Sequence, residues 1–423
     1  MKILFLSQHY RPESCDTRTS QLAAGMAARG HRAQALTTFP NYPFGKVFGG
    51  YKQRLCKKEH IDGVSVVRVP MFTDHSRSSK RRGLSYLSFG FSAFVLGALF
   101  TRRPNLIWIH HPPLTTGIAG YLLARLKRVP YVYEIHDLWP ETLVSSGMIK
   151  EGRVTRAIRK VCGFLHKRAA AIIVTSPGMK THLERQNVDP EKIVVIPQWA
   201  DETLFRPVDQ DLEFGLRHGL IGKRSIVFAG NLGIAQGLDT VLDAASLLSD
   251  ISDLQFVLVG DGVESERLQT RCVLEGIGNV RFVGQQPAAE VAKFLAWSEA
   301  GLIHLKRDPL FAITVPSKTQ AYMACGTPIL CGVAGDGADA VEEAGCGFTF
   351  SPEDAADLSA KVRALVSLTV PEKDRLAVSA LAYFEKNYSR QRILDRYSEL
   401  FGNLVGYGIA VTQMEEASER KAA

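Results

Sequence analysis

The chain has 423 residues, of which 46% are hydrophobic and 22% are charged. These fractions exclude a disordered or fibrous chain, and the length predicts two domains. Basic charge is concentrated in residues 1–205, where 30 Lys and Arg stand against 14 Asp and Glu, whereas residues 206–423 carry 21 against 29. We therefore expect only the first half to face a polyanion. An anionic lipid or a phosphorylated acceptor suits it better than a nucleic acid, because no nucleic-acid-binding motif is present.

The cysteines and the N-terminus indicate a reducing, cytoplasmic location. The seven cysteines form no C-x-x-C pair, and no histidine cluster at metal-ligand spacing accompanies them. We therefore expect buried, reduced thiols, with no disulfide framework and no metal. The N-terminal sequence MKILFLSQHY has a four-residue apolar run that polar residues follow at once. This pattern predicts a first strand and not a secretion signal.

Short apolar segments recur along the chain and are separated by segments of helix length. In the first half, strands are predicted at residues 2–6, 33–37, 64–69, 105–109, 131–135, 171–175 and 193–196. In the second half, strands are predicted at residues 225–230, 254–260, 280–284, 300–305 and 328–332. Continuous apolar runs are typical of parallel strands that are buried on both faces. Their alternation with helices predicts an α/β fold with parallel sheets.

The predicted domain boundary lies near residue 205, where the segment IPQWADETLFRP has a proline near each end, which suits a hinge. The first domain is then 1–205 and the second is 206–385. Residues 386–406 are predicted as an amphipathic helix that packs back on the first domain, with apolar positions at 393, 394, 397, 400, 401 and 404. Residues 407–423 are predicted as a disordered tail.

Residues 83–100 (GLSYLSFGFSAFVLGALF) form a long apolar segment between basic clusters at 80–82 and 102–103. About 20 apolar residues are needed to cross a bilayer, and this segment is shorter and contains three Ser and three Gly. A core helix of the first domain is the favoured interpretation. The alternative is a helix that touches lipid, which would place the protein at the periphery of the inner face of the cytoplasmic membrane.

Polar residues follow several of the predicted strands directly. His136 and Asp137 follow the strand at 131–135, and Asn231, Asp261 and Lys306 follow strands of the second half. In open parallel sheets, ligands bind beyond the carboxyl ends of the strands. These side chains are therefore the first candidates for a functional site.

The segment VYEIHDLWPE at 132–141 makes a family resemblance specific. With TTFPNYPFGKVFGGY (37–51), FAGNLGIAQGLDTVLDAA (228–245), LVGDG (258–262) and HLKRDPLFAITVPSKTQAYMACGTPIL (304–330), it resembles glycosyltransferase family 4 from residue 1 to about 400. The most similar subgroup builds bacterial surface polysaccharides such as O-antigen and capsule, and includes transferases of the amino sugar N-acetyl-L-fucosamine. The resemblance implies a retaining enzyme of the GT-B fold, with two Rossmann-like, doubly wound parallel-sheet domains facing across a cleft.

In the first domain, the resemblance implies that His136 contacts the donor sugar near the bond that breaks. A neutral imidazole both donates and accepts a hydrogen bond, which suits a sugar hydroxyl. Asp137 is the expected orienting partner. On the acceptor side we expect Asn41 and Tyr42 from the matching segment, and Arg11 and Arg18 because a guanidinium fits a phosphate.

In the second domain, the resemblance implies a diphosphate site at a Gly-Arg-Leu-x-x-x-Lys-Gly motif, but this chain lacks both cations. The same register contains Gly230, Asn231, Gln236 and Gly237. We expect Lys306 and Lys318 to supply the missing charge, with Ser317 at the start of a helix whose N-terminus favours anions. Asp261 completes this expected donor site.

A second departure concerns the family's pair of glutamates, spaced E-x7-E, of which the second usually binds the donor ribose. Its positions are Ile313 and Ala321 in this chain. Gln320 is the nearest polar side chain, although a helix turns it about 100° away. The subgroup-like sequence around it favours a different way of binding the nucleotide over a degenerate scaffold.

The sequence therefore predicts a metal-independent transferase without a cofactor. It would move a hexose or N-acetylamino sugar from a UDP-linked donor to a lipid-linked or growing polysaccharide acceptor, with retention. Two alternatives remain open. A nucleotide-sugar 2-epimerase of the same fold would show catalytic carboxylates in the cleft, and a non-catalytic partner protein would show no turnover.

Overall fold

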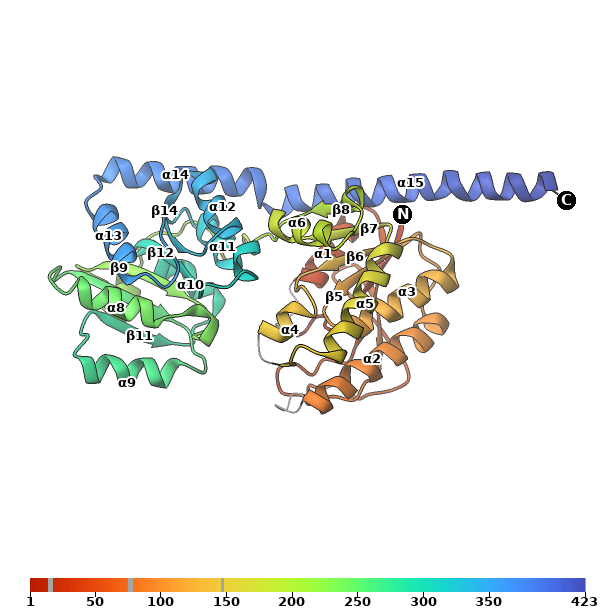
Figure 1. Cartoon of the computed structure of the whole chain (residues 1–423), viewed down its shortest axis with the longest axis horizontal. Coiled ribbons are helices and arrows are strands. Elements are labelled where there is room, and N and C mark those ends of the chain that lie inside the picture. The colour runs from red at the N-terminus through yellow and green to blue at the C-terminus, as the bar shows by residue number, and fades with distance from the viewer. Residues whose placement is uncertain (14–17, 75–78, 146–147, 423) are drawn as a thin grey trace. The chain divides into compact units, whose positions relative to one another are not determined.

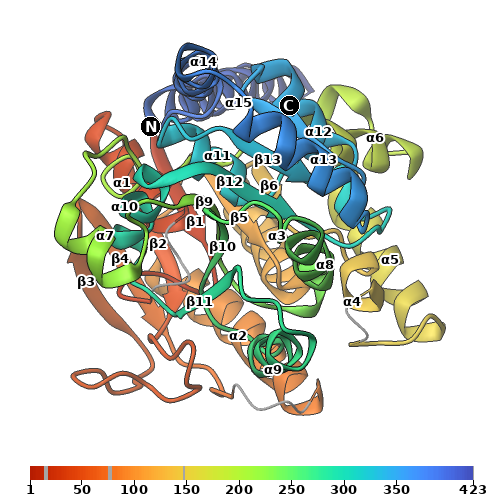
Figure 2. The ribbon, with the colours of Figure 1, turned by 90° about the vertical axis from the view of Figure 1, so that its left-hand side faces the viewer.

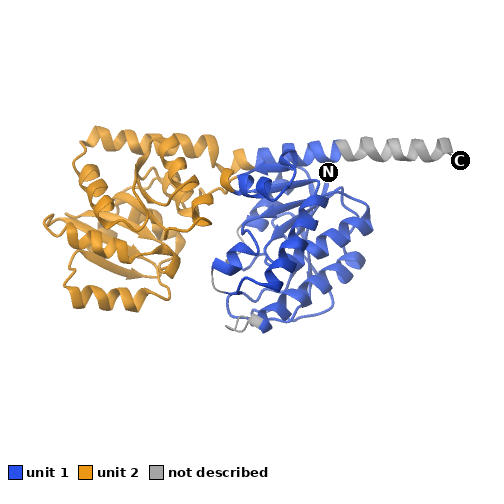
Figure 3. Cartoon of the chain, viewed as in Figure 1, with its two compact units in different colours: residues 1–175, 179–196, 394–423 blue, residues 176–178, 197–393 orange. Residues whose placement is uncertain are grey.

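The computed structural model describes residues 1–13, 18–74, 79–145 and 148–422, and strands alternate with helices along both halves (Figure 1). The chain divides into two compact units (Figure 3). Unit 1 comprises residues 1–175, 179–196 and 394–423, and unit 2 comprises residues 176–178 and 197–393. The division at 196/197 lies before the boundary at 205 that the sequence predicted, and the chain returns to unit 1 at Leu394.

Unit 1 contains an eight-stranded sheet in the order β3-β4-β2-β1-β5-β6-β7-β8. The strands are β1 (Lys2–Leu6), β2 (Arg32–Thr38), β3 (Lys57–Ile61), β4 (Val64–Val69), β5 (Leu106–His111), β6 (Tyr131–Ile135), β7 (Ala171–Val174) and β8 (Ile193–Val195). All neighbours are parallel except β3, which pairs antiparallel with β4. Strand β3 was not predicted, because KKEHI is a charged edge strand and not a buried apolar run.

Helices cover both faces of this sheet. They are α1 (Arg18–Ala28), α2 (Ser79–Phe100), α3 (Leu114–Lys127), α4 (Glu141–Ser145), α5 (Arg153–Arg168), α6 (Pro177–Arg185), the 3-10 turn η1 (Pro190–Lys192) and α15 (Arg390–Ala422). Gly120 of α3 packs on the Ile109 side chain, and Tyr397 of α15 bonds to Glu134 beside Trp108. Because successive strand residues face opposite sides, α3 and α15 lie on opposite faces. Figure 1 shows α2, α3 and α5 in one layer.

The C-terminal helix α15 packs on unit 1 through the apolar positions that the sequence pattern indicated. Ile393, Leu394, Tyr397 and Phe401 are buried. A Cβ on Gly25 of α1 would come within 2.6 Å of Leu394, so the two helices touch there. The bounds of α15 extend to Ala422, and the disordered tail at 407–423 stays a prediction.

Helix α2 is buried on one side and exposed on the other. It is long and apolar enough to cross a membrane by length and composition, yet 33% of its most apolar stretch is buried. Phe89 and Ala93 lie in the core, and Gly97 packs closely on side chains of β2 and α3. The opposite face is apolar as well and exposes Leu84, Leu87, Phe91 and Leu99. The helix is therefore part of the core on one side only.

Unit 2 contains a six-stranded parallel sheet in the order β11-β10-β9-β12-β13-β14. The strands are β9 (Arg224–Ala229), β10 (Leu254–Val259), β11 (Val280–Gly284), β12 (Ser298–His304), β13 (Ile329–Gly332) and the unpredicted short edge strand β14 (Gly347–Thr349). Alternate residues of the central strands enter two separate cores. Val227 and Val257 belong to one core, and Phe228 and Phe256 belong to the other.

The helices of unit 2 close these two cores. They are α7 (Leu212–His218), η2 (Ile234–Gln236), α8 (Asp239–Leu247), α9 (Ser265–Glu275), α10 (Ala288–Ala296), η3 (Phe311–Ile313), α11 (Ser317–Ala324), α12 (Asp336–Ala344), α13 (Ala355–Val366) and α14 (Val370–Asn387). Residues of α8, α9 and α13 line one core, and residues of α10, α11 and α14 line the other. Figure 2 shows α8 and α13 to one side of the central strands and α10 to the other. Both units are thus doubly wound, as predicted.

The cysteines show no disulfide within the described residues. Six of them, at positions 56, 162, 272, 325, 331 and 346, are free thiols, and four of the six are buried. Cys15 lies outside the described residues.

Candidate active site

In unit 2, two glycines let the ends of β9 and β10 approach each other. Gly230 follows β9 with φ +150°, and Gly260 follows β10 with φ +144°. A Cβ on Gly260 would lie 1.9 Å from the carbonyl oxygen of Gly230, so a larger residue does not fit. Strand β9 lies between β10 and β12, where the winding of the sheet reverses. A sheet of this kind opens a ligand crevice at that point.

Lys318 supplies a cation at this point. Helix α11 begins at Ser317, so Lys318 lies in its first turn. Its Nζ donates to Oε1 of Gln236 at 3.1 Å and lies 4.8 Å from the ring centre of Phe228. A Cβ on Gly230 would come within 2.7 Å of the Lys318 Cε, so the lysine lies directly against the loop that begins at Gly230, called the Gly230 loop below.

The charge of Lys318 is not balanced inside the protein. No carboxylate lies within ion-pair distance of its Nζ in the part of the chain that the structure describes. Burial lowers the pKa of the Lys318 ammonium to about 8, because the charged form loses hydration and gains no opposite charge. A bound anion would supply the missing partner.

Four further predicted donor residues gather around Lys318. Gly230 and Gln236 contact it directly, and Gly237, with φ +57°, ends the 3-10 turn η2. The backbone N–H of Lys306 donates to the carbonyl of Ala235 at 2.9 Å. A Cβ on Gly237 would meet Cγ of Lys306 at 3.1 Å. The structure therefore brings these predicted residues into one cluster.

His304, which the sequence analysis did not single out, holds this cluster in place. It is fully buried at the end of β12 and stacks on the Phe350 ring at 5.8 Å. Its Nδ1 lies 2.6 Å from the carbonyl oxygen of Gln236, and the backbone N–H of Glu353 donates to its Nε2 at 3.1 Å. This pattern fits a neutral imidazole that donates through Nδ1, and burial lowers the pKa of His304 accordingly. The signal in the sequence was that His304 is a histidine within the otherwise apolar predicted strand at 300–305.

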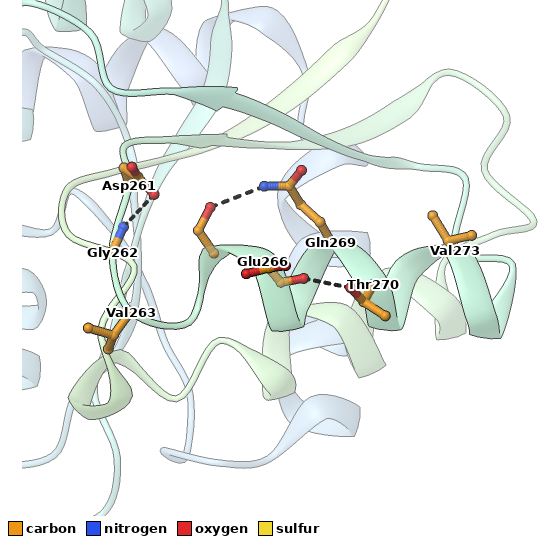
Figure 4. A pocket seen from close by; sticks show the side chains of 8 residues that line it. Asp261, Gly262, Val263, Glu266, Gln269, Thr270 and Val273 are labelled. Atoms are coloured by element: carbon orange, nitrogen blue, oxygen red, sulfur yellow. Dashed lines mark hydrogen bonds between the residues drawn. The ribbon is translucent and has the colours of Figure 1, made fainter.

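Asp261 lies beside residues 230–232, because its carbonyl oxygen accepts from the backbone N–H of Leu232 at 2.9 Å. It lines a pocket of about 530 Å³ along α9, together with Glu266, Gln269 and Thr270 (Figure 4). The Asp261 carboxylate accepts from the backbone N–H of Gly262 at 2.7 Å. Two carboxylates and no basic side chain line this pocket within the described residues, so it does not suit a phosphate. Asn231 is exposed beside it at the start of the Gly230 loop.

The remaining predicted donor residues lie on α11. Ser317 is exposed at the first position of the helix. Gln320 is buried and, with its amide oriented to satisfy its neighbours, donates to the carbonyl oxygens of Pro316 and Ser317. It therefore fastens the helix start and does not face the Lys318 cluster. Ala321 is buried one residue later, so no carboxylate occupies that point of the helix.

In unit 1, His136 follows β6 and is held by Glu134. The His136 Nε2 and Glu134 Oε1 atoms are 2.9 Å apart. The backbone N–H of His136 donates to the carbonyl of His111 at 3.1 Å, which fixes the chain at the end of the strand. The imidazole is 13% exposed and the Glu134 carboxylate is fully buried. The geometry thus presents an oriented ring at the carboxyl edge of the sheet.

Glu134 is a buried carboxylate with partners on both oxygens. Trp108 Nε1 donates to its Oε2 at 2.7 Å, and the Tyr397 hydroxyl donates to the same oxygen at 2.6 Å. Arg18 Nε donates to Oε1 at 3.4 Å, and Arg18 Nη2 donates to the Tyr397 hydroxyl oxygen at 2.9 Å. Burial alone would raise the pKa of Glu134, but Arg18, His136 and Tyr397 together lower it to about 2. The glutamate in the otherwise apolar strand YVYEI was a signal that the sequence analysis did not use.

His110 stands beside His136 with its ring centre 4.6 Å away. Its Nδ1 is buried and has no hydrogen-bond partner among the described residues. Burial, reinforced by the neighbouring His136, lowers the pKa of His110 well below its usual value. His110 is therefore a neutral ring with an unused polar atom next to the predicted sugar-contacting residue.

The structure ties both predicted acceptor arginines to carboxylates. Arg18 neutralises Glu134 from inside the unit, as described above. Arg11 lies at the surface, where its Nη1 and the Asp62 carboxylate are 2.7 Å apart. Asp137, the predicted partner of His136, is exposed. Glu134, which the sequence did not indicate, contacts the imidazole of His136 directly.

Asn41 and Tyr42, the other predicted acceptor residues, lie in a loop that Glu13 organises. The buried carboxylate of Glu13 accepts from the backbone N–H of Asn41 at 2.6 Å and of Tyr42 at 2.8 Å. Its other oxygen lies 3.1 Å from His9 Nδ1. Burial raises the pKa of Glu13, but His9 and the two backbone donors outweigh this and lower it. Asn41 is buried, whereas the half-buried Tyr42 ring stands edge-on to His9.

No group of three or more His, Cys, Asp or Glu side chains is placed to hold a metal ion in the described parts of the chain. The two strand-end clusters, around Lys318 and around His136, contain the groups that could act on a substrate. The first suits an anion and the second suits a neutral hydroxyl.

Two family models cover most of the chain. Residues 15–199 match the "Glycosyl transferase 4-like domain", and residues 223–367 match "Glycosyl transferases group 1". The matched segments lie in unit 1 and unit 2 respectively, apart from a few residues at the junction.

Curated relatives match both domains. WbjE of Pseudomonas aeruginosa, named as a glycosyltransferase, is 28% identical over 331 residues, which cover 76% of this chain and 81% of WbjE. WcaI of Escherichia coli K12, named for glycosyl transfer in colanic acid biosynthesis, is 28% identical over 337 residues, which cover 77% of this chain and 82% of WcaI.

Solved structures share the fold along nearly the whole chain. Sucrose-phosphate synthase of Thermosynechococcus elongatus aligns with a TM-score of 0.73 at 18% identity, covering 96% of this chain and 99% of the synthase. HepE of Anabaena, solved in complex with UDP-glucose, aligns with a TM-score of 0.70 at 17% identity, covering 95% of this chain and all of HepE. These likenesses confirm the predicted GT-B fold.

Proposed function

We propose that this chain, which belongs to the GT-B glycosyltransferases, moves a hexose or an N-acetylamino sugar from a UDP-linked donor to a lipid-linked or growing surface-polysaccharide acceptor. The relatives WbjE and WcaI support the transferase class and the polysaccharide setting. The complex of HepE with UDP-glucose supports a nucleotide-sugar donor. The amino sugar is the choice that the subgroup resemblance favours.

The unbalanced cation of Lys318 is the observation that carries this proposal. A nucleotide diphosphate brings about two negative charges, which must be compensated as it leaves. Lys318 is held by Gln236 against the Gly230 loop, without a carboxylate among the described residues. Lys306 lies in the same cluster. The two lysines would replace the arginine and lysine that the family motif usually provides.

In the proposed reaction, the acceptor hydroxyl oxygen bonds to the anomeric carbon as the bond from that carbon to the diphosphate breaks. The leaving diphosphate takes the hydroxyl proton on the same face of the sugar, so the configuration is retained and no protein nucleophile or metal is needed. His136 would position a donor sugar hydroxyl. Glu134 serves as the positioning residue for His136.

We also propose that the protein works at the inner face of the cytoplasmic membrane, where a lipid-linked acceptor would be presented. The exposed apolar face of α2, with Leu84, Leu87, Phe91 and Leu99, supports this location. Basic residues flank the helix at both ends, and near an anionic surface each contributes about 1 kcal/mol.

The comparisons do not favour the two alternatives. A nucleotide-sugar 2-epimerase would convert its donor without an acceptor, and a non-catalytic partner would convert nothing. Incubating the purified protein with UDP-N-acetylglucosamine alone and following the sugar by NMR distinguishes the epimerase.

The donor proposal is tested by thermal unfolding in the presence of a panel of UDP-, GDP- and dTDP-sugars. A specific donor should raise the unfolding temperature by mass action, with EDTA present or absent. Lys318→Met should weaken that donor by about 1–3 kcal/mol because a charged hydrogen bond is lost. Lys386→Met, which removes an exposed lysine of α14, is the matched control. Equal donor affinity in wild type and Lys318→Met would remove Lys318 from the site.

A further inference from the structure

A pocket in unit 1 lies at the end of the sheet where the parallel strands β1 and β2 begin. Lys2 is the first residue of β1 and Arg32 is the first residue of β2. Arg102 and Arg103 follow the end of α2 and precede β5. The pocket has a volume of about 360 Å³. It is separate from the His136 cluster, which lies where β6 ends.

The pocket is strongly basic. Its lining includes Lys2, Arg32, Lys58, His60, Arg102 and Arg103, and no acidic residue from the described parts of the chain. None of these six side chains makes an ion pair with another described residue. Arg103 donates to the carbonyl oxygen of Arg128, and Lys58 Nζ lies 5.9 Å from the Phe100 ring centre. Five permanent positive charges therefore surround one concave space without internal compensation.

The ligand that suits this charge is a phosphate-bearing anion. Guanidinium and ammonium groups bind phosphate oxygens through charge-assisted hydrogen bonds. Gln34 is also at the pocket, but its side-chain oxygen accepts from the Arg102 backbone N–H at 3.2 Å. The polar groups left for a ligand are therefore chiefly cationic donors.

The neighbourhood of the pocket indicates which phosphate. Phe100, the last residue of α2, lines it, and the preceding Leu99 is 72% exposed. Along the same side of α2 lie Leu84, Leu87 and Phe91, all exposed. The neighbouring helix α3 exposes Leu122 and Leu126. A free phosphate would leave this apolar surface exposed to water, whereas a phospholipid has both a phosphate for the basic pocket and acyl chains for the apolar surface.

We propose that this pocket binds the phosphate headgroup of an anionic phospholipid while the exposed face of α2 enters the lipid. The inference rests on the proposed membrane location and not on the transfer reaction. The pocket would give the basic unit 1 a defined attachment point on the membrane, in addition to its general attraction to anionic lipid. The far edge of the sheet, with His136, does not take part in the attachment.

Co-sedimentation with phosphatidylcholine vesicles, with and without phosphatidylglycerol, tests the proposal on the full chain. The double variant Lys58→Gln/Arg102→Gln should bind phosphatidylglycerol vesicles about 25-fold more weakly, since each charge near an anionic surface is worth roughly fivefold. The control Arg185→Gln/Lys192→Gln removes two charges near β8, at the other end of the strand order. It should bind nearly as well as wild type. If both double variants lose the same vesicle affinity, the effect depends on net charge alone and the proposed headgroup site is wrong.

A variant that fills the pocket without changing its charge tests whether lipid binding needs the pocket itself or only its positive charges. Ser65 lines the pocket and is half-buried, so Ser65→Phe should exclude the headgroup and weaken vesicle binding while thermal unfolding stays near wild type. Wild-type affinity for vesicles in Ser65→Phe contradicts the proposal.

Soluble anions distinguish the lipid from a free phosphate. Inorganic phosphate and glycerol 1-phosphate should bind at least about 100-fold more weakly than vesicle-borne phosphatidylglycerol, because they lack the apolar part of the contact. Comparable affinity for a soluble phosphate would overturn the assignment to lipid. Donor binding in the pocket variants should equal wild type, so a failure here leaves the proposed transferase function intact.

Discussion

Glu134 in β6 of unit 1 is a fully buried charge, Lys318 in the first turn of α11 of unit 2 is a partly buried charge, and the two have opposite surroundings. Glu134 has Arg18, His136, Trp108 and Tyr397 around it, and these partners lower its pKa to about 2. Lys318 has the neutral Gln236 as its hydrogen-bond partner, and burial lowers its pKa to about 8.

The difference indicates that the Glu134 charge has a structural role and that the Lys318 charge is available to bind an anion. A buried ion with a full set of partners fixes the groups around it, as Glu134 fixes the His136 ring. A buried ion without an opposite charge costs stability. The folded protein tolerates that cost at a place where an anionic substrate would bind.

The largest expected effect follows from removing Glu134. Glu134→Ala removes the buried carboxylate that Arg18, Trp108 and Tyr397 share, so the free energy of unfolding should fall by about 3–5 kcal/mol. Urea unfolding at neutral pH measures it. The stabilisation should be complete above the unfolded pKa of a glutamate and lost as pH falls through about 2, because the folded pKa lies below the unfolded one.

Glu151→Ala is the matched control for that experiment, because the Glu151 carboxylate is 59% exposed in its pair with Arg159. It should change the free energy of unfolding by less than about 0.5 kcal/mol. A loss in Glu134→Ala no greater than the loss in Glu151→Ala would show that Glu134 is not a structural charge.

The next effect concerns activity and not stability. His136→Ala should lower the turnover number about 10- to 100-fold, that is by about 1.4–2.7 kcal/mol, while the donor still binds, since its proposed contact matters most as the glycosidic bond breaks. Steady-state release of nucleoside diphosphate measures it, and thermal unfolding shows that the variant is folded. His182→Ala, on α6, serves as the control. Full activity in His136→Ala removes the imidazole from the reaction.

The sequence was sufficient for most of the fold, because buried parallel strands are continuous apolar runs. It failed for β3, whose charged residues suit an edge strand, and for the short β14. For the candidate site, it predicted Gly230 and Gln236 from the family register, Lys306 from a strand end and Lys318 from a helix start, and the structure places these four residues in one cluster.

It could not show which predicted site residues are occupied by internal contacts. Arg18 was expected to bind an acceptor phosphate, yet it contacts Glu134 and Tyr397, which are distant in sequence. The roles of Glu134 and His304 likewise depend on partners that only the folded chain brings together. Local spacing carries no information about such long-range pairs.

The pH dependence of UDP binding tests the difference between the two charges most directly. With a pKa of about 8 in the free protein, Lys318 is charged at pH 7 and loses its proton above pH 8. UDP affinity measured by calorimetry should therefore fall by up to about tenfold per pH unit above 8, and binding there should take up a proton. Lys318→Met should bind UDP weakly and without this dependence. UDP affinity that stays constant between pH 7 and pH 9.5 in the wild type, or that falls equally in Lys318→Met, would contradict the account.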